Sequence, residues 1–348
     1  MSNTAVLENA LLPLRPLLAR EDVTELVINN AGEAAIETRD GWSWETLPDL
    51  NEKSLLALAR AAAAFTHQDI SQSTPICSTI LPSGERVQLV VPPAVPAGTV
   101  SITIRKPSSV TLTMEDFERG GLFSETKIAT RQVSPLDVEL RDLLDAGKHV
   151  EFFQKAVQGR KNILISGATG SGKTTLSKGL IQLIPPHERL LTIEDTRELV
   201  VPHRNVVHML YAKDKQGTAK ISAKDLLESA LRMRPDRILL QELRDGTAFF
   251  YLRNVNSGHP GSITTIHADS AELAFEQLTL LVKESEGGAD LARDDIRSLL
   301  KLLVDVVVQT KKAQSAPSCD FGQVGERFGN VAFGIDDGNH RRGQFAPS

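Results

Sequence analysis

Gly167-Ala168-Thr169-Gly170-Ser171-Gly172-Lys173-Thr174 is the segment that decides the fold of this 348-residue chain. It fits the pattern G-x-x-x-x-G-K-[ST], in which backbone N–H groups of a glycine-rich loop surround phosphate oxygens. An apolar run at 162–166 precedes the segment and a helical run at 173–184 follows it, which is the context that this pattern requires. The positive end of the helix dipole then points at the phosphates. We therefore predict a P-loop that binds ATP.

Two side chains of this segment have separate expected roles. Lys173 places a positive charge at the β- and γ-phosphates, and the hydroxyl of Thr174 is an expected ligand of Mg²⁺. Thr175 completes the predicted nucleotide-binding segment. The alternative is a glycine-rich turn without a ligand, and the strand, the helix and the lysine together argue against it.

Carboxylates follow two of the apolar strands that surround this loop. Glu194 and Asp195 come directly after the run at 190–193, and Glu242 comes directly after the run at 238–241. Strand ends border the nucleotide crevice in an open α/β sheet, so we expect these acids near the phosphates. We assign Glu194 to activation of the attacking water and Glu242 to Mg²⁺, and the reverse assignment stays open. Acids that only face solvent are the alternative.

A histidine is the remaining candidate for the catalytic centre. The glycine-rich turn at 257–262 leads into a short strand, and His267 lies at the far end of this strand. An imidazole there could donate a hydrogen bond to a phosphate oxygen or to the attacking water, and so sense the γ-phosphate. The alternative is a structural histidine bonded to a backbone carbonyl.

The order of apolar patterns predicts an α/β chain with a P-loop NTPase domain of the RecA type and a smaller mixed α/β domain before it. We expect an N-terminal domain at 1–106, a linker at 107–133, and an ATPase domain at 134–348 whose tail after Lys312 is peripheral. Ser134-Pro135 marks the helix start of the second domain. Alternation of strands and helices after it predicts a parallel sheet. The expected strands of this sheet are 162–166, 190–193, 238–241, 262–266 and 304–309, with helices at 173–184, 223–233 and 271–283.

In the first domain we expect a strand at 23–29 and an Ala/Leu-rich helix at 53–66. Alternating patterns at 85–91 and 99–105 predict an antiparallel hairpin around a proline-rich turn. A further helix near 6–18 is amphipathic. It could rest on a membrane surface, but packing against its own domain is the favoured alternative.

Charge and cysteine content limit the function classes. A net charge of -5 without a basic run argues against direct binding of nucleic acid. Cys77 and Cys319 lie far apart without metal-ligand spacing, so we interpret them as ordinary thiols in a reducing compartment. No apolar run approaches the roughly 18 residues that span a bilayer, and we expect a cytoplasmic protein.

Three motifs of the second domain together carry a family resemblance. They are Thr192-Ile193-Glu194-Asp195 with Glu198-Leu199, the segment Pro235-Asp236-Arg237-Ile238-Leu239-Leu240-Gln241-Glu242-Leu243-Arg244, and Ser257-Gly258-His259 through His267-Ala268. This domain resembles the secretion traffic ATPases, hexameric P-loop NTPases of type II and type IV secretion and of type IV pili. Gln241 departs from the family pattern, which usually has a small residue before the glutamate.

The first domain resembles the type IV secretion branch, the VirB-type ATPases that also serve conjugation. The segments that carry this resemblance are Leu81-Pro82-Ser83-Gly84-Glu85-Arg86 and Ser101-Ile102-Thr103-Ile104-Arg105-Lys106-Pro107. The resemblance implies that Arg86 and Arg105 reach the nucleotide phosphates. The alternative is that both arginines form ion pairs with nearby acids on the same sheet. Type II assembly ATPases commonly have a four-cysteine zinc module, which two cysteines cannot build.

The function that follows is hydrolysis of ATP with Mg²⁺ in a homohexameric ring. Such a ring would power assembly of, or transport through, a type IV secretion or conjugation apparatus at the cytoplasmic face of the inner membrane. Its partners would be the inner-membrane proteins of that machinery, and peripheral membrane contact is part of this expectation. The alternatives are a pilus assembly or retraction ATPase, a nucleotide-gated assembly switch with slow turnover, and a DNA translocase, against which the net charge argues.

Overall fold

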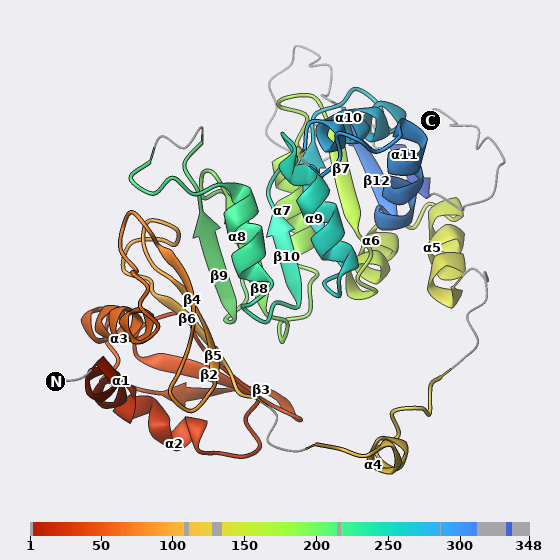
Figure 1. The fold of residues 1–348 in the computed structure, drawn as a ribbon. Helices are drawn as coiled ribbons and strands as arrows, with labels where there is room; N and C mark the ends of the chain where they lie inside the picture. The colour runs from red at the N-terminus through yellow and green to blue at the C-terminus, as the bar shows by residue number, and fades with distance from the viewer. Residues whose placement is uncertain are drawn as a thin grey trace, which may run out of the picture.

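The computed structural model describes residues 3–107, 111–126, 134–213, 217–285, 287–311 and 332–335. Its elements form an N-terminal module, from α1 to β6, and a larger C-terminal module, from α5 to β13 (Figure 1). Helix α4 (Met114–Arg119) lies on the segment between them. The α/β class and the P-loop architecture are as predicted. Strand β6 ends at Arg105 and α5 begins at Pro135, and the domain limits at 106 and 134 stay a prediction.

The N-terminal module contains a six-stranded antiparallel sheet with the order β3-β2-β1-β6-β5-β4. Its strands are β1 (Glu25–Ile28), β2 (Glu33–Thr38), β3 (Gly41–Thr46), β4 (Ile76–Ile80), β5 (Arg86–Val90) and β6 (Ser101–Arg105). Strands β5 and β6 form the predicted hairpin around the proline-rich turn. Because successive side chains of a strand point to opposite faces, each strand contributes to two different surfaces.

One face of this sheet packs against the first helices. These are α1 (Asn3–Leu11), the 3-10 turn η1 (Leu12–Leu14), α2 (Arg15–Leu18) and α3 (Glu52–Phe65). Asn51 caps α3 by accepting a hydrogen bond from the backbone N–H of Ser54 at 3.0 Å. Leu7, Leu11 and Leu14 are fully buried in a cluster with α3 and the sheet. The apolar stripe of the first helix therefore packs on its own module, which was the favoured interpretation.

The opposite face of the same sheet lies against the C-terminal module. Asn29, just past β1, donates a hydrogen bond to Asn205 at 2.9 Å and accepts one from the guanidinium of Arg189 at 2.8 Å. Gln88 donates to Ser229 at 2.9 Å. Other contacts across this boundary are Glu37 with Arg234, Glu33 with Arg204, Thr103 with Arg189, and Trp44 beneath the guanidinium of Arg204. Polar bonds and stacked arginines therefore join the two modules.

The C-terminal module contains the predicted parallel sheet. Its strands are β7 (Ile163–Gly167), β8 (Leu190–Glu194), β9 (Val206–Leu210), β10 (Arg237–Leu240), β11 (Ile263–Ile266), β12 (Val306–Thr310) and β13 (Ala332–Ile335). They are ordered β10-β8-β9 and β11-β7-β12-β13, and a bridge between Glu242 and Thr265 joins the two sets. All pairs are parallel except β12–β13. Part of the tail expected to be peripheral, 332–335, thus extends the sheet.

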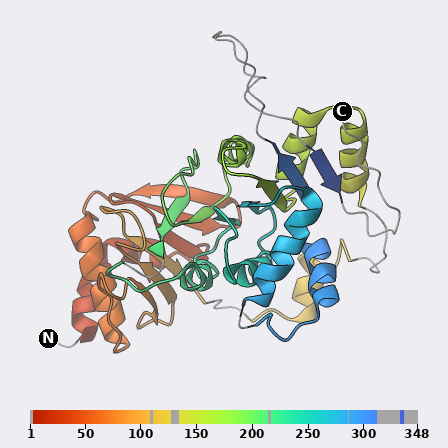
Figure 2. The ribbon, with the colours of Figure 1, turned by 90° about the horizontal axis from the view of Figure 1, so that it is seen from above.

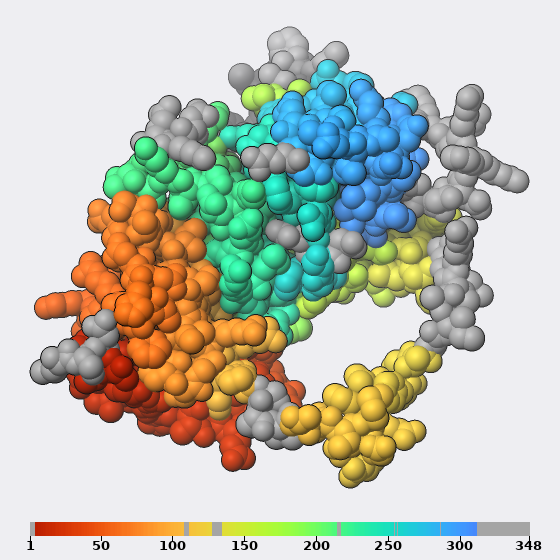
Figure 3. Space-filling model, viewed as in Figure 1, coloured from red at the N-terminus to blue at the C-terminus, as the bar shows by residue number. Residues whose placement is uncertain are grey.

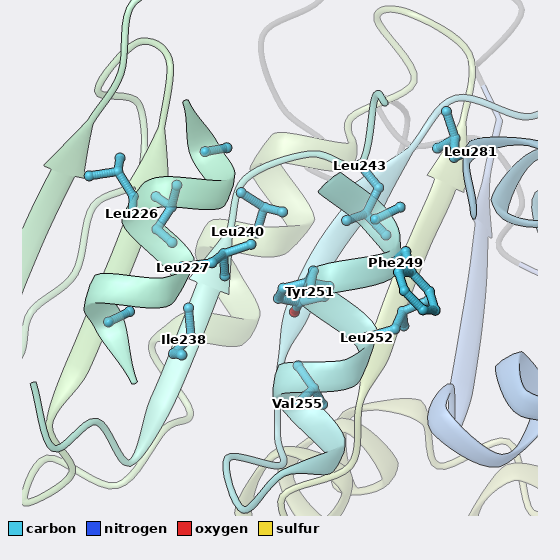
Figure 4. Packing of buried hydrophobic residues seen from close by; sticks show 14 of the residues in the cluster. Leu226, Leu227, Ile238, Leu240, Leu243, Phe249, Tyr251, Leu252, Val255 and Leu281 are labelled. Atoms are coloured by element: carbon cyan, nitrogen blue, oxygen red, sulfur yellow. The ribbon is translucent and has the colours of Figure 1, made fainter. Parts of the chain in front are cut away.

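Helices cover both faces of this sheet, as a parallel sheet requires. They are α5 (Pro135–Asp145), α6 (His149–Gln158), α7 (Lys173–Ile181), α8 (Ala223–Ala230), α9 (Thr247–Asn256), α10 (Ala271–Lys283) and α11 (Arg293–Leu303). Figure 4 shows Leu226 and Leu227 of α8 beside Ile238 and Leu240 of β10, with Tyr251 of α9 next to them. Each such buried side chain stabilises the fold by about 1.5–3 kcal/mol. A second cluster, which includes residues of α6 and α7, fills the other face. Figure 2, seen from above, shows the yellow-green helices on one side of this sheet and the blue helices on the other.

The connecting segment has its own short helix. Thr113 and Asp116 form a reciprocal capping box at the start of α4. The residues of the segment itself therefore determine where this helix begins. Figure 3 shows this segment, in yellow, standing away from both modules. Among the described residues, no helix combines the length and apolarity needed to cross a bilayer. Cys77 is buried, which raises the pKa of its thiol, whereas Cys319 lies outside the described residues.

Glu25 generates a testable prediction about pH and stability. It is only 4 % exposed, and burial raises its pKa from 4.5 to about 7 even though Arg105 lies 3.5 Å away. The folded chain keeps this proton up to about pH 7 while the unfolded chain releases it near pH 4.5, so stability falls as pH rises through this window. In the wild type, the contribution of Glu25 to the free energy of unfolding should fall by on the order of 2 kcal/mol between pH 4.5 and pH 7. Glu25→Gln should remove this decrease, and urea unfolding at a series of pH values measures it. The exposed Glu21→Gln is the matched control, and an identical pH dependence in both variants would refute the prediction.

Candidate functional site

The loop between β7 and α7 has the backbone that a phosphate cradle needs. Gly170 and Gly172 have φ of 77° and 91°, in the left-handed region that favours glycine, and Gly172 is the N-cap of α7. A Cβ on Gly167 would lie 2.3 Å from the hydroxyl oxygen of Thr310, so β12 approaches the loop too closely for a side chain. Thr310 also shares a 2.7 Å hydrogen bond with Ser171 and donates one at 3.0 Å to the carbonyl of residue 166. Thr310, the last residue of β12, thus holds the P-loop in place through these hydrogen bonds.

Lys173 is the first residue of α7 and directly follows this loop. Its ammonium donates to the carbonyl oxygens of Gly167 at 2.7 Å and Ala168 at 3.1 Å, and its Nζ is 3.3 Å from Nδ1 of His267. Burial lowers the pKa of Lys173, while the negative charge of Glu242 opposes this effect. The predicted lysine and the predicted histidine are therefore in contact.

Glu242 and His267 form the centre of a chain of polar contacts. Glu242 Oε1 is 3.0 Å from Nε2 of His267, and Glu242 Oε2 is 2.6 Å from Nη2 of Arg244. The other terminal nitrogen of Arg244 donates to Asp195 at 2.6 Å. The hydrogen bond with Glu242, supported by both acids, raises the pKa of Arg244. A continuous set of contacts thus connects Lys173 to the ends of β8 and β10.

Glu194 has a different environment from the one expected of a residue that activates water. Its side chain is fully buried, and Oε2 accepts hydrogen bonds from the backbone N–H groups of Glu198 at 2.7 Å and Leu199 at 2.8 Å. Oε1 accepts one from Thr192 at 2.9 Å and lies 3.6 Å from Nδ1 of His208. Burial would raise the pKa of Glu194, but these hydrogen bonds outweigh it and the pKa lies below its ordinary value. Its geometry is that of a carboxylate that holds the loop at 195–199.

Glu198 is the acid to which sequence reasoning gave no role. It is exposed at the same end of the sheet, and its Oε2 accepts a 2.9 Å hydrogen bond from the amide of Gln241. Gln241 directly precedes Glu242, so Glu198 is linked to the predicted site. Its position in the acidic motif could have identified it. Glu198 lies beyond the end of the buried strand, where a side chain remains accessible to solvent.

The residues present fit Mg²⁺ better than a metal held by protein ligands alone. Thr174 is half-buried in the first turn of α7, where its hydroxyl has no side-chain partner among the described residues. Across the same described part of the chain, no group of three or more His, Cys, Asp or Glu residues could hold a metal. Mg²⁺ is usually held by one or two protein oxygens together with water and phosphate oxygens. A single hydroxyl such as that of Thr174 is compatible with a donor set of this kind.

Arg86 and Arg105 lie on the N-terminal sheet, away from the P-loop of their own chain. They are opposite each other on β5 and β6, both are exposed, and Arg105 Nε is 3.5 Å from Glu25. Thr103, two residues before Arg105, contacts Arg189 at the start of β8. Glu194 ends β8, about 16 Å from Arg189 along an extended strand. The part of the N-terminal module that carries Arg105 thus lies at the start of β8, at the opposite end of this strand from the P-loop edge (Figure 1). Elsewhere in the same module, the carbonyl of Ala94 accepts a 2.8 Å hydrogen bond from the backbone N–H of Leu210 at the end of β9.

Comparison with known proteins places this geometry in a family. The family model described as "Type II/IV secretion system protein" matches residues 50–339. The type IV secretion system protein VirB11 of Bartonella henselae is 52% identical over 326 residues, covering 89% of this chain and 90% of that protein. VirB11 of Brucella suis is 46% identical over 299 residues, covering 85% and 83%.

A solved structure agrees with the sequence comparison. The crystal structure of the VirB11 ATPase from the Brucella suis type IV secretion system, in complex with sulphate, superposes with a TM-score of 0.86. It is 42% identical, and the match covers 94% of each chain. The chain therefore belongs to the type II/IV secretion system protein family, in the type IV secretion branch that the VirB11 proteins represent.

Proposed function

We propose that this protein hydrolyses ATP with Mg²⁺ in a homohexameric ring and so drives a type IV secretion apparatus at the inner membrane. The observation that carries the proposal is the meeting of the P-loop lysine, His267 and the strand-end acids in one set of contacts. The name of the VirB11 ATPase from Brucella suis supports the assignment of ATP hydrolysis. The inner-membrane proteins of the apparatus would be its partners.

The residues of the chain would divide the work as follows. The N–H groups of the loop and the start of α7 would bind the phosphates, and Lys173 would turn from its own loop carbonyls to the β- and γ-phosphate oxygens. Thr174 and, through water, Glu242 would hold Mg²⁺, which supplies neutralisation of phosphate charge when bound. When Lys173 turns away, His267 would lose its contact with the lysine, keep its contact with Glu242 and sense the γ-phosphate.

We assign proton acceptance from the attacking water to Glu198 in place of Glu194. Both oxygens of Glu194 already accept hydrogen bonds, and its side chain is fully buried, so an attacking water cannot reach it. Glu198 keeps an exposed carboxylate at the same strand ends. Glu194 would then orient Glu198 through the backbone hydrogen bond between them.

We assign Arg86 and Arg105 to the nucleotide of a neighbouring copy. Within one chain they lie near the strand starts, whereas the P-loop is at the strand ends. A head-to-tail ring brings one surface of each copy against a different surface of the next, so the exposed arginines of one module could close over the P-loop of another. Their guanidinium groups would stabilise charge on the transferring phosphoryl group and link hydrolysis to movement between copies.

The first test compares the two glutamates of the acidic motif. We expect Glu198→Gln to lower kcat by at least about 100-fold without a change in thermal unfolding, because loss of a general base costs that much and the side chain is exposed. Glu194→Gln should instead lower the unfolding temperature, because a buried amide cannot replace all four interactions of the carboxylate. ATPase assays and calorimetry measure the two effects.

Exposed Glu272→Gln, on α10, is the matched control for this comparison, and Lys173→Ala is the inactive reference. If Glu194→Gln abolished turnover at unchanged stability while Glu198→Gln retained it, the original assignment to Glu194 would be right.

The second test asks whether the arginines act between copies. Lys173→Ala alone and the double variant Arg86→Ala, Arg105→Ala should each be inactive as pure rings. Rings co-assembled from equal amounts of both should recover roughly a quarter of wild-type turnover, since half of the sites have an intact P-loop and half of these face intact arginines. Rings that carry two different affinity tags, purified in sequence, allow this measurement. Mixed rings as inactive as their parents would mean that the arginines act within one chain.

A further inference from the structure

Gln241 is held at three points. Its backbone N–H donates to the carbonyl of Ile193 at 3.2 Å, and its carbonyl accepts a hydrogen bond from Thr265 at 2.9 Å. These bonds fix its backbone to both neighbouring strands, β8 and β11. The side-chain amide then donates to Oε2 of Glu198 at 2.9 Å. A rigid part of the sheet therefore presents a hydrogen-bond donor to the loop after β8.

Glu198 receives complementary restraints from this arrangement. Its backbone N–H donates to Glu194 at 2.7 Å, which fixes the position of its backbone. Within the described part of the chain, the amide of Gln241 is the hydrogen-bond partner that the structure gives its carboxylate. Without this amide, the three side-chain torsions of an exposed glutamate would be free to rotate.

We propose that Gln241 is a positioning residue for Glu198. It fixes one carboxylate oxygen and leaves the other directed to water; this inference rests on the proposed role of Glu198 as proton acceptor.

The chemistry of an amide suits this task. A neutral donor can orient a carboxylate without adding a positive charge beside it, whereas a lysine or arginine would weaken its attraction for a proton. The positive charge at this end of the sheet is already supplied by Arg244, which binds Asp195 and Glu242 and not Glu198. Gln241 can therefore restrict the movement of the base without neutralising it.

Two substitutions test this role in the full-length protein. Gln241→Met keeps the length and removes the donor, and we expect a loss of roughly fivefold to thirtyfold in kcat with the KM for ATP changed by less than about twofold. Gln241→Glu places a second carboxylate against Glu198, so the two would share a proton. The acidic limb of its kcat–pH profile should move to higher pH. Exposed Gln154→Ala, on α6, is the control and should match the wild type.

The outcomes separate this inference from the proposed function. If Glu198→Gln kept wild-type kcat, the assignment of Glu198 would fail, and the inference with it. If Glu198→Gln were inactive while both Gln241 variants kept wild-type kcat and pH profile, only the role of Gln241 would be overturned. A merely structural role would lower thermal stability and kcat at every pH without moving the acidic limb, and this result would also overturn it.

Discussion

The parallel pairing of β7, β8, β10 and β11 is the constraint on which the site depends. Parallel strands end at the same edge, so the P-loop after β7, the acidic loop after β8, Glu242 after β10 and His267 after β11 meet there. The two strand sets are joined by the bridge between Glu242 and Thr265. Glu242 thus fixes the spacing between the two halves of the sheet as well as contacting His267. A shift of one half against the other would separate Glu242 from His267 and Lys173, which both lie on the β11-β7 half.

Strand β8 also connects the site with the contact between the modules. Arg189, just before it, is fully buried and bonds Asn29 and Thr103 of the N-terminal module, and burial lowers its pKa to about 9. Glu194, at its other end, holds the acidic loop. Five residues therefore separate the module contact from the loop that carries Glu198. In the proposed ring, a movement of the N-terminal module would act on the site through this short strand.

Local patterns in the sequence were sufficient for the main architecture but not for side-chain roles. The P-loop, the parallel strands β7, β8, β10, β11 and β12 and the β5–β6 hairpin have strong apolar patterns and clear end signals, and the structure confirms them. Strands β2 and β3 were not predicted, because Trp42 and Trp44 are half-buried under arginines of the other module instead of in a core of their own. Glu194 and Glu198 both follow an apolar run, and only long-range burial and hydrogen bonds distinguish them. Likewise, no sequence feature of Arg105 shows whether it acts within its own chain or, as proposed, on a neighbouring copy.

The most direct measurement is a crystal structure or a cryo-electron microscopy map with Mg²⁺ and a non-hydrolysable ATP analogue. We predict the γ-phosphate at the ammonium of Lys173. Glu198 should lie within hydrogen-bond distance of the attacking water and Glu242 within hydrogen-bond distance of a water bound to Mg²⁺, while Glu194 stays buried against 198–199. Triphosphate bound elsewhere, or a γ-phosphate at Lys173 with both Glu198 and Glu242 turned away from it, would contradict the proposed mechanism.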